Sequence, residues 1–364
     1  MTCSNKINLT YRYRIKDSIS RVALCLLAKN VNFVFNYVNE LHVKQHKKYT
    51  SSEITSSYLN KYSVNNLLAG CSTELNLHSQ TIQAIGETYC KAIKVGKFKS
   101  SLAWRSSKRS LGWIPFKASA IKFIKTASGL DAIRYNKQEF KIYNSRPLPE
   151  DAKITNGSFV QDSRGRWFVS ISFEIEKTQF VHPKKIVGVD LGIKDAITLS
   201  DGMKIERPNL IKKYEASLAV AQRANKTTRV RSIHTKIKNS RKDYYHKITS
   251  ELAKQYAGFY VGDVKSQAIV DKDISSGMTK GVYDASWFAI KTFLSYKANK
   301  LGGVFKEVSE RYTTVGCSGC GAPTGPSGVK ELHIREWQCC ICDSVHDRDV
   351  NAAKNILRIG RYTL

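Results

Sequence analysis

The chain has 364 residues, with 59 lysines and arginines against 30 acidic residues, and a formal net charge of +29. Hydrophobic residues make up 42%, which excludes a wholly disordered protein, and the length allows two or three domains. A charge this large repels itself unless a polyanion neutralises it, so nucleic acid is the expected partner and a merely basic soluble protein the alternative.

The sequence offers no sign of a membrane partner. No run approaches the ~18 apolar residues of a membrane span, and Met1–Thr10 lacks the apolar core of a signal peptide. We therefore expect a reducing compartment, which is the nucleoid-associated cytoplasm of a prokaryote or the nucleus of a eukaryote. In such a compartment cysteines favour metal ligation over disulfides.

The N-terminal part reads as one strand followed by helices. Weak alternation predicts a strand over Lys6–Arg14. A helical pattern then begins at Asp17 or Ser18, either of which can cap it, and further helices are expected from Ser51 and from Ser79.

Near residue 98 the sequence becomes basic and aromatic. We expect this stretch to stack on bases or contact phosphates, although its apolar members could equally be core. The candidate residues are Trp104, Arg105, Lys108, Arg109 and Lys117. A turn at Asp162–Gly165 then predicts a hairpin over Gly157–Glu174, so this region resembles a small antiparallel sheet or barrel.

The C-terminal half alternates strands and helices. We expect strands at Ile186–Leu191, Ala196–Leu199, Gly258–Val264 and Val304–Val308, and helices at 206–257, Asp284–Lys300 and Asn351–Ile359. The first of these helical stretches is densely basic and predicts phosphate contacts through Lys236, Lys238, Arg241 and Lys242. The loop Lys265–Gly281 is either a gate or a passive connector.

Two Cys-x-x-Cys pairs predict a structural zinc site. The ligands are Cys317, Cys320, Cys339 and Cys342, because paired knuckles complete a tetrahedral Zn²⁺ site. Four thiolates leave no open position, so the site should be structural. Cys340 lies inside the second knuckle and is expected to be a spectator, with a swap for Cys339 as the alternative.

Two aspartates stand out as candidate ligands of a second metal site. Asp190 ends a hydrophobic strand and, by alternation, points away from Val187 and Val189. Gly188 and Gly192 would leave room on its side for a metal and a phosphate. A hydrogen-bonded structural aspartate is the alternative. Asp349 opens the last helix and could face the same metals.

In combination these motifs resemble the TnpB family, which is related to type V CRISPR effectors and to Fanzor proteins. The order is Asp-Leu-Gly-Ile, a basic helix, a strand, two Cys-x-x-Cys knuckles and Asp-Arg-Asp-x-Asn-Ala-Ala-x-Asn-Ile. The resemblance covers about residues 180 to 360. It implies an RNA-guided DNA endonuclease that binds guide RNA and target double-stranded DNA, as a monomer or as a homodimer on one RNA.

The resemblance also implies a multidomain α+β fold. A wedge β-barrel would span 1–15 and 98–183, with a helical recognition segment at 16–97. A RuvC-like RNase H domain would span 184–313 and 347–364, with a zinc ribbon inserted at 314–346. Two Mg²⁺ ions on the catalytic acids would drive hydrolysis. Arg348, beside Asp349, is a further candidate for nucleic-acid contact.

The chain departs from the family at its third acid. Gly262 stands where most members carry a glutamate, and Asp263 should point to the opposite face. Some relatives carry this glutamate on the next strand, which here is Glu310, and Gly262 would leave space for it. Glu307 has the opposite strand parity, and Asp263 could bind only through a bulge or twist.

Three functions stay open at this point. The first is an RNA-guided nuclease with catalytic residues Asp190, Glu310 and Asp349. The second is an RNA-guided DNA-binding protein that does not cut, motivated by the missing acid. The third is a DNA-binding accessory protein without a guide. Within the first, a transposon nuclease and a CRISPR effector derived from TnpB cannot be separated by these residues.

Overall fold

The structure is a computed structural model that describes residues 6–54, 59–96, 100–126, 129–148, 152–177, 185–264, 286–327, 331 and 333–362. The chain divides into two compact units, Met1–Glu176 and Lys177–Leu364. Each unit is built around its own hydrophobic core. The expected gate at 265–281 lies outside the described residues.

Unit 1 contains a seven-stranded antiparallel sheet in the order β2-β6-β7-β1-β5-β4-β3. The two outermost strands of this order are consecutive in the chain and are joined only by the 3-10 turn Ala118–Ala120. Three residues cannot span a flat sheet of seven strands, each about 4.8 Å from the next, so the sheet must curl. The strands are β1 (Lys6–Ile15), β2 (Trp113–Lys117), β3 (Ile121–Lys125), β4 (Asp131–Tyr135), β5 (Gln138–Tyr143), β6 (Lys153–Gln161) and β7 (Trp167–Glu176).

The predicted hairpin is confirmed as the β6–β7 pair. Its register aligns Gln161 with Trp167 across the turn. Alternate β7 side chains, from Trp167 to Phe173, are almost fully buried, as the period of two requires.

Three helices complete unit 1, namely α1 (Ser18–Thr50), α2 (Lys61–Leu67) and α3 (Ser79–Val95). Asp17 caps α1 by accepting the N–H of Ser20, which selects it over Ser18. The expected helix from Ser51 is wrong, because α1 continues to Thr50 and Ser51 is its C-cap. Among the described helices, α1 alone is long and apolar enough to span a membrane, but its buried residues pack in the core of unit 1.

Unit 2 contains a five-stranded sheet in the order β10-β9-β8-β11-β12. The pairs β10–β9 and β9–β8 are antiparallel, whereas β8, β11 and β12 run parallel. The carboxyl ends of these three strands therefore meet at one edge of the sheet. The strands are β8 (Ile186–Asp190), β9 (Asp195–Leu199), β10 (Lys204–Glu206), β11 (Gly258–Gly262) and β12 (Val304–Val308).

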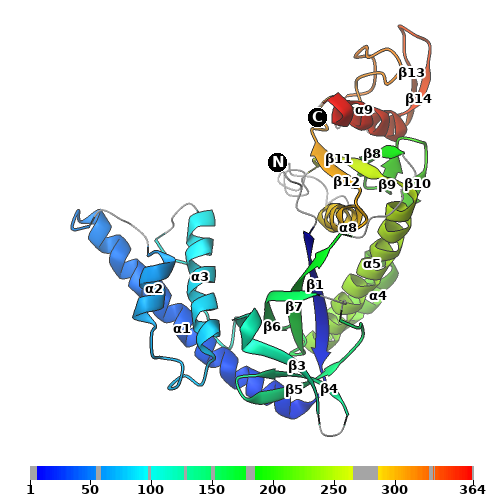
Figure 1. The fold of residues 1–364 in the computed structure, drawn as a ribbon. Helices are drawn as coiled ribbons and strands as arrows, with labels where there is room; N and C mark the ends of the chain where they lie inside the picture. The colour runs from blue at the N-terminus through cyan, green and yellow to red at the C-terminus, as the bar shows by residue number, and fades with distance from the viewer. Residues whose placement is uncertain are drawn as a thin grey trace. The chain divides into compact units, whose positions relative to one another are not determined.

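Helices cover both faces of this sheet (Figure 1). One face packs against α5 and α8 through residues that include Val187, Val189 and Trp287. The other packs against α9 through Tyr260, Val308 and Ile356. Helices α4 and α5 form a pair with a small core of its own. The helices are α4 (Leu210–Arg223), α5 (Thr227–Gln255), α8 (Trp287–Lys300) and α9 (Arg348–Tyr362).

The cysteine-containing segment lies between β12 and α9. It includes a two-stranded ribbon of β13 (Glu336–Gln338) and β14 (Val345–Asp347), paired antiparallel. The short β14 leads directly into α9, so the ribbon and the first turn of that helix are covalently continuous.

Candidate functional site

Asp190 occupies the carboxyl end of β8 and points toward α9, away from Val187 and Val189 as alternation predicted. The expected role of Gly188 is wrong. A Cβ at Gly188 would collide with the carbonyl oxygen of Ala353, so this glycine admits helix α9 and leaves no room for a metal. At Gly192 a Cβ would lie against the carbonyl oxygen of Asp195, and that position too is filled by backbone.

Glu310 lies where Gly262 leaves space. It follows β12 by two residues, and its Oε2 is 3.0 Å from the position that a Cβ on Gly262 would occupy. Ile356 of α9 closes the same space, with its Cδ1 at 3.3 Å. The side chain of Glu310 therefore fills the volume above the strand where a glutamate at 262 would begin.

Glu307 takes the other direction. It pairs in register with Val261, whose side chain lies on the face covered by α8, and it binds Lys291 of that helix at 2.7 Å. As the parity argument predicted, it is directed away from Glu310.

Asp349 and Asp347 have different positions at the start of α9. Asp347 accepts the N–H groups of Asp349 and Val350 through Oδ1, at 3.1 and 3.0 Å, and so caps the helix. It also binds Lys204 at 2.6 Å, which helps to hold its pKa below the usual value. Asp349 lies within the first turn, and its charge acts on Asp190. Asp347 is thus engaged by the helix N-terminus and Lys204, whereas Asp349 is the acid of this turn whose charge reaches Asp190.

Asp190 lies within reach of the negative charges of both Asp349 and Glu310. Burial, followed by the charges of Asp349 and Glu310, raises the pKa of Asp190 to about 8. Burial and the charge of Asp263 raise the pKa of Glu310, whereas the nearby Lys291 lowers it. Arg335 lies 3.3 Å from Asp349 and offsets part of this negative charge. The charge of Arg348 lowers the pKa of Asp190, but the net shift stays upward, so the metal-free site favours a protonated Asp190.

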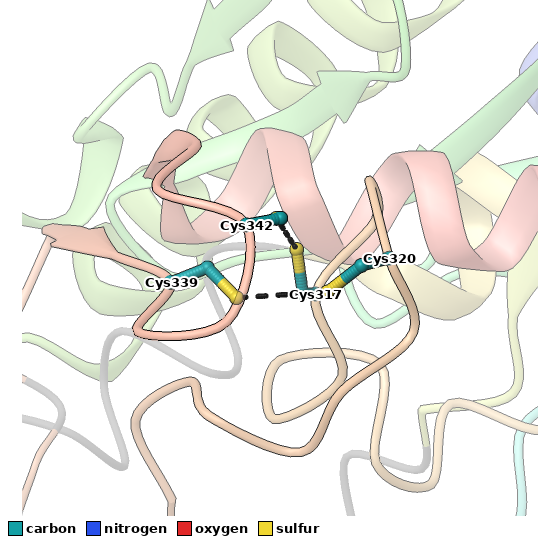
Figure 2. A group of neighbouring side chains, drawn as sticks. All are labelled: Cys317, Cys320, Cys339 and Cys342. Carbon is teal, nitrogen blue, oxygen red and sulfur yellow. Dashed lines mark hydrogen bonds between the residues drawn. The ribbon is translucent and has the colours of Figure 1, made fainter.

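The four predicted zinc ligands come together. The donor atoms of Cys317, Cys320, Cys339 and Cys342 all lie within 4.8 Å of one another, and Figure 2 shows them converging from two loops. Across the described part of the chain, no other set of three or more Cys, His, Asp or Glu side chains gathers this tightly. Cys339 belongs to this group and Cys340 does not, which favours Cys339 over the swap.

His346 was not anticipated at this site. It is 7% exposed, and its Nε2 lies 3.0 Å from Sγ of Cys317. Its position three residues before Asp349, on the strand that leads into α9, places the cysteine cluster next to the carboxylates along the chain.

Two asparagines on α9 hold the chain between Glu310 and the first cysteine. Asn351 and Asn355 are almost fully buried, and both donate to the carbonyls of Thr313 and Gly316, at 2.6 to 3.2 Å. Asn351 also accepts the N–H of Ser318. Their spacing of one helical turn was visible in the sequence, but the carbonyls they bind were not.

The predicted nucleic-acid contacts fall into two groups. Six are on the surface, and Trp104 is 58% exposed. Four are held by the protein. Arg105 donates to Asn32, Lys117 pairs with Glu87, and Arg241 donates to Ser286. Arg348 is 5% exposed and donates to the carbonyl of Glu331, so the expectation that it contacts nucleic acid is not supported. The exposed residues are Trp104, Lys108, Arg109, Lys236, Lys238 and Lys242.

The fold is similar to that of a solved Cas12f1 complex. The structure titled "Cryo-EM structure of the Cas12f1-sgRNA-target DNA complex" covers 97% of this chain and 99% of its own, with a TM-score of 0.66 and 13% identity. At that identity the likeness concerns the fold. The description "Cas12f1-like, TNB domain" matches residues 287–356, and "Probable transposase" matches residues 170–273.

Sequence relatives define the family. A protein of Streptomyces pristinaespiralis named "Putative RNA-guided DNA endonuclease" is 31% identical over 297 residues, covering 78% of this chain and 69% of the relative. InsQ of Escherichia coli K12, named in the same words, is 30% identical over 56% of each chain. TnpB-like protein L79 of Acanthamoeba polyphaga mimivirus is 24% identical over 60% of this chain and 46% of its own. The chain belongs to the TnpB family.

Proposed function

We propose that this protein is a transposon-associated, RNA-guided DNA endonuclease that hydrolyses phosphodiester bonds at Asp190, Glu310 and Asp349. The observation that carries the proposal is the position of Glu310 over Gly262. A noncleaving protein was motivated by the loss of the third acid. Because the carboxylate of Glu310, just beyond the neighbouring strand β12, occupies that space, the missing acid no longer argues for a noncleaving protein.

The three carboxylates suit hard divalent cations. Their oxygens are the ligands that Mg²⁺ prefers. Burial first, and then the charges of Asp349 and Glu310, raise the pKa of Asp190, and a bound cation would oppose both effects. When bound, paired Mg²⁺ ions would activate the attacking water and stabilise the leaving oxygen of the phosphodiester.

The protein's own groups prepare this site. Asp190 must lose its proton to act as a ligand, so metal binding and deprotonation are coupled. Asp349 must exchange its pairing with Arg335 for a cation, which leaves that exposed guanidinium beside the site, where a phosphate would lie. Asp347 stays on Lys204 and the helix N-terminus and holds the first turn of α9 in place.

The four cysteines would hold one structural Zn²⁺. Their mutual distances suit a single tetrahedral ion, and all four positions are filled by protein. His346 beside Cys317 would stabilise a ligand thiolate from outside the coordination shell.

The rest of the chain would hold nucleic acid. The curled sheet of unit 1 would be the wedge barrel and its helices the recognition segment, whereas unit 2 would be the RuvC-like RNase H domain with the zinc ribbon. The exposed lysines of α5 would follow the phosphates of a guide RNA. The guide would read the target strand of double-stranded DNA by base pairing.

Moving the glutamate back to its usual strand tests the proposal. Glu310→Ala should lower cleavage by about 10³-fold or more, because a ligand of the metals is lost. Gly262→Glu in that background should restore a measurable part. Removing Oε2 leaves the alanine Cβ of residue 310 at 3.4 Å and Ile356 at 3.3 Å from the new Cβ.

The matched control is Gly262→Gln with Glu310→Ala, which offers the same bulk without a carboxylate and should stay inactive. If Glu310→Ala cuts as fast as wild type while Asp190→Ala is inactive, the proposal that Glu310 replaces the glutamate missing at residue 262 is wrong. The guide itself is tested by sequencing the RNA that copurifies with the chain. A discrete transposon-end transcript is expected, and its absence would favour an accessory DNA-binding protein.

A further inference from the structure

The segment that carries Glu310 leaves the sheet before it reaches the glutamate. The last register pair between β11 and β12 is Gly262 with Val308. One more bond follows, in which the N–H of Asp263 donates to the carbonyl of Val308 at 2.9 Å. Glu310 lies beyond this point, so strand pairing by itself does not fix the backbone from which its side chain extends.

The next hydrogen bond beyond the β11–β12 ladder is made by a side chain and not by the main chain. In a parallel ladder, a residue that donates its N–H to one partner residue accepts, through its carbonyl, the N–H two residues further along. That rule would direct the N–H of Glu310 to the carbonyl of Asp263. In this structure the N–H of Glu310 lies 3.2 Å from Oδ1 of Asp263. The carboxylate therefore continues the ladder in place of the main chain.

We propose that Asp263 is a positioning residue for Glu310, and that Gly262 and Asp263 together receive the relocated glutamate. Gly262 provides the space for its side chain, and Asp263 fixes its backbone. This inference rests on the proposed role of Glu310 as a metal ligand. It assigns Asp263 a positioning role, because the hydrogen bond of its Oδ1 is to the backbone of Glu310, and the variants below separate this role from ligation.

Two substitutions separate the hydrogen bond from the charge. Asp263→Asn retains an oxygen acceptor and loses the charge, whereas Asp263→Ala loses both. Glu139→Ala is the control, because it removes an exposed carboxylate that pairs with Arg134 in unit 1. All three are compared with wild type as the full chain bound to its copurified RNA.

The first readout is amide hydrogen exchange of the peptide around Glu310, followed by mass spectrometry in the absence of Mg²⁺. Asp263→Ala should speed exchange several-fold, whereas Asp263→Asn and Glu139→Ala should match wild type. This measurement does not depend on cleavage. It tests the anchor even if the wild-type complex cuts no DNA, which would overturn the proposed function alone.

The second readout is the Mg²⁺ concentration at half-maximal cleavage. Asp263→Ala should raise it about tenfold, as removal of groups that orient metal ligands does, with a smaller loss of rate at saturating Mg²⁺. Asp263→Asn should stay within about threefold of wild type, since the hydrogen bond is kept. Wild-type exchange and Mg²⁺ dependence in Asp263→Ala would overturn the inference. Equal loss of Mg²⁺ affinity in both variants without faster exchange would also overturn it and assign Asp263 as a ligand.

Discussion

The cysteine cluster and the carboxylate cluster of unit 2 are built in opposite ways. The cysteines come from one segment, 317 to 342, and two short loops bring them together. The carboxylates come from the ends of β8 and α9 and from the chain beyond β12, and they meet only when the sheet and α9 have packed. A site whose ligands lie close together in the chain, such as the cysteine cluster, can be recognised from their spacing in the sequence. A site assembled by tertiary packing can move a ligand to the next strand, about 4.8 Å away, and keep its chemistry.

The largest effect should distinguish the two aspartates at the start of α9. Asp349→Ala should reduce cleavage by about 10³-fold or more, since it removes a metal ligand. Asp347→Asn should keep most activity, because an asparagine can still cap the helix. Cleavage rates of both variants, with RNA binding as the control, check the assignment. Equal loss of activity in both would show that Asp347 also acts on the metals.

A second prediction concerns the local site. Cys339→Ser should lose bound zinc and unfold the ribbon, because Zn²⁺ binding provides much of the folding energy of such a small module. Cys340→Ser should retain one zinc per chain. Zinc content by elemental analysis and protease sensitivity of the ribbon measure both. Retention of zinc in Cys339→Ser would mean that Cys340 or His346 can replace the ligand.

A third prediction concerns Asn351 and Asn355 of α9, which hold the segment between Glu310 and Cys317. Their loss should lower the free energy of unfolding. Thr313 and Gly316 each accept hydrogen bonds from Asn351 and from Asn355. Each single alanine variant should cost about 1–2 kcal/mol of unfolding free energy. The double variant should cost more than the sum, because the carbonyls of Thr313 and Gly316 then lose both asparagine donors. Denaturant unfolding of the four proteins measures the coupling, and strict additivity would contradict it.

The smallest effect is a pH dependence of the metal-free protein. The pKa of Asp190 is raised from 3.8 to about 8 in the folded chain, so the folded state binds the proton more tightly than the unfolded state. Stability from this group is present at acidic pH and is lost as the pH rises through about 8. Asp190→Asn should therefore melt higher than wild type at pH 8.5 by a few degrees, and by less at pH 5.5. Saturating Mg²⁺ should remove the advantage.

Several features of this protein followed from short stretches of sequence. The cap at Asp17, the β6–β7 hairpin and the four thiols each depend on residues close together in the chain. The parity of Asp190 and of Glu307 also followed, because alternation along a strand is a local property. The helix expected at Ser51 failed, since α1 continues through a polar, exposed end to Thr50 and Ser51 is its C-cap.

Tertiary packing decided the rest. The sequence predicted that Gly188 leaves room for a metal. In the structure the backbone of α9 packs against Gly188, and this contact depends on how the helix docks on the sheet. Arg348 looked like a phosphate contact, yet burial turns it toward the carbonyl of Glu331. The sequence by itself determined the family, the zinc knuckles and the acids available for a second site. The family resemblance already pointed to Glu310 over Gly262. Only the packed sheet placed the backbone N–H of Glu310 on Asp263, because a contact between residues 47 positions apart depends on strand register and leaves no mark in local spacing.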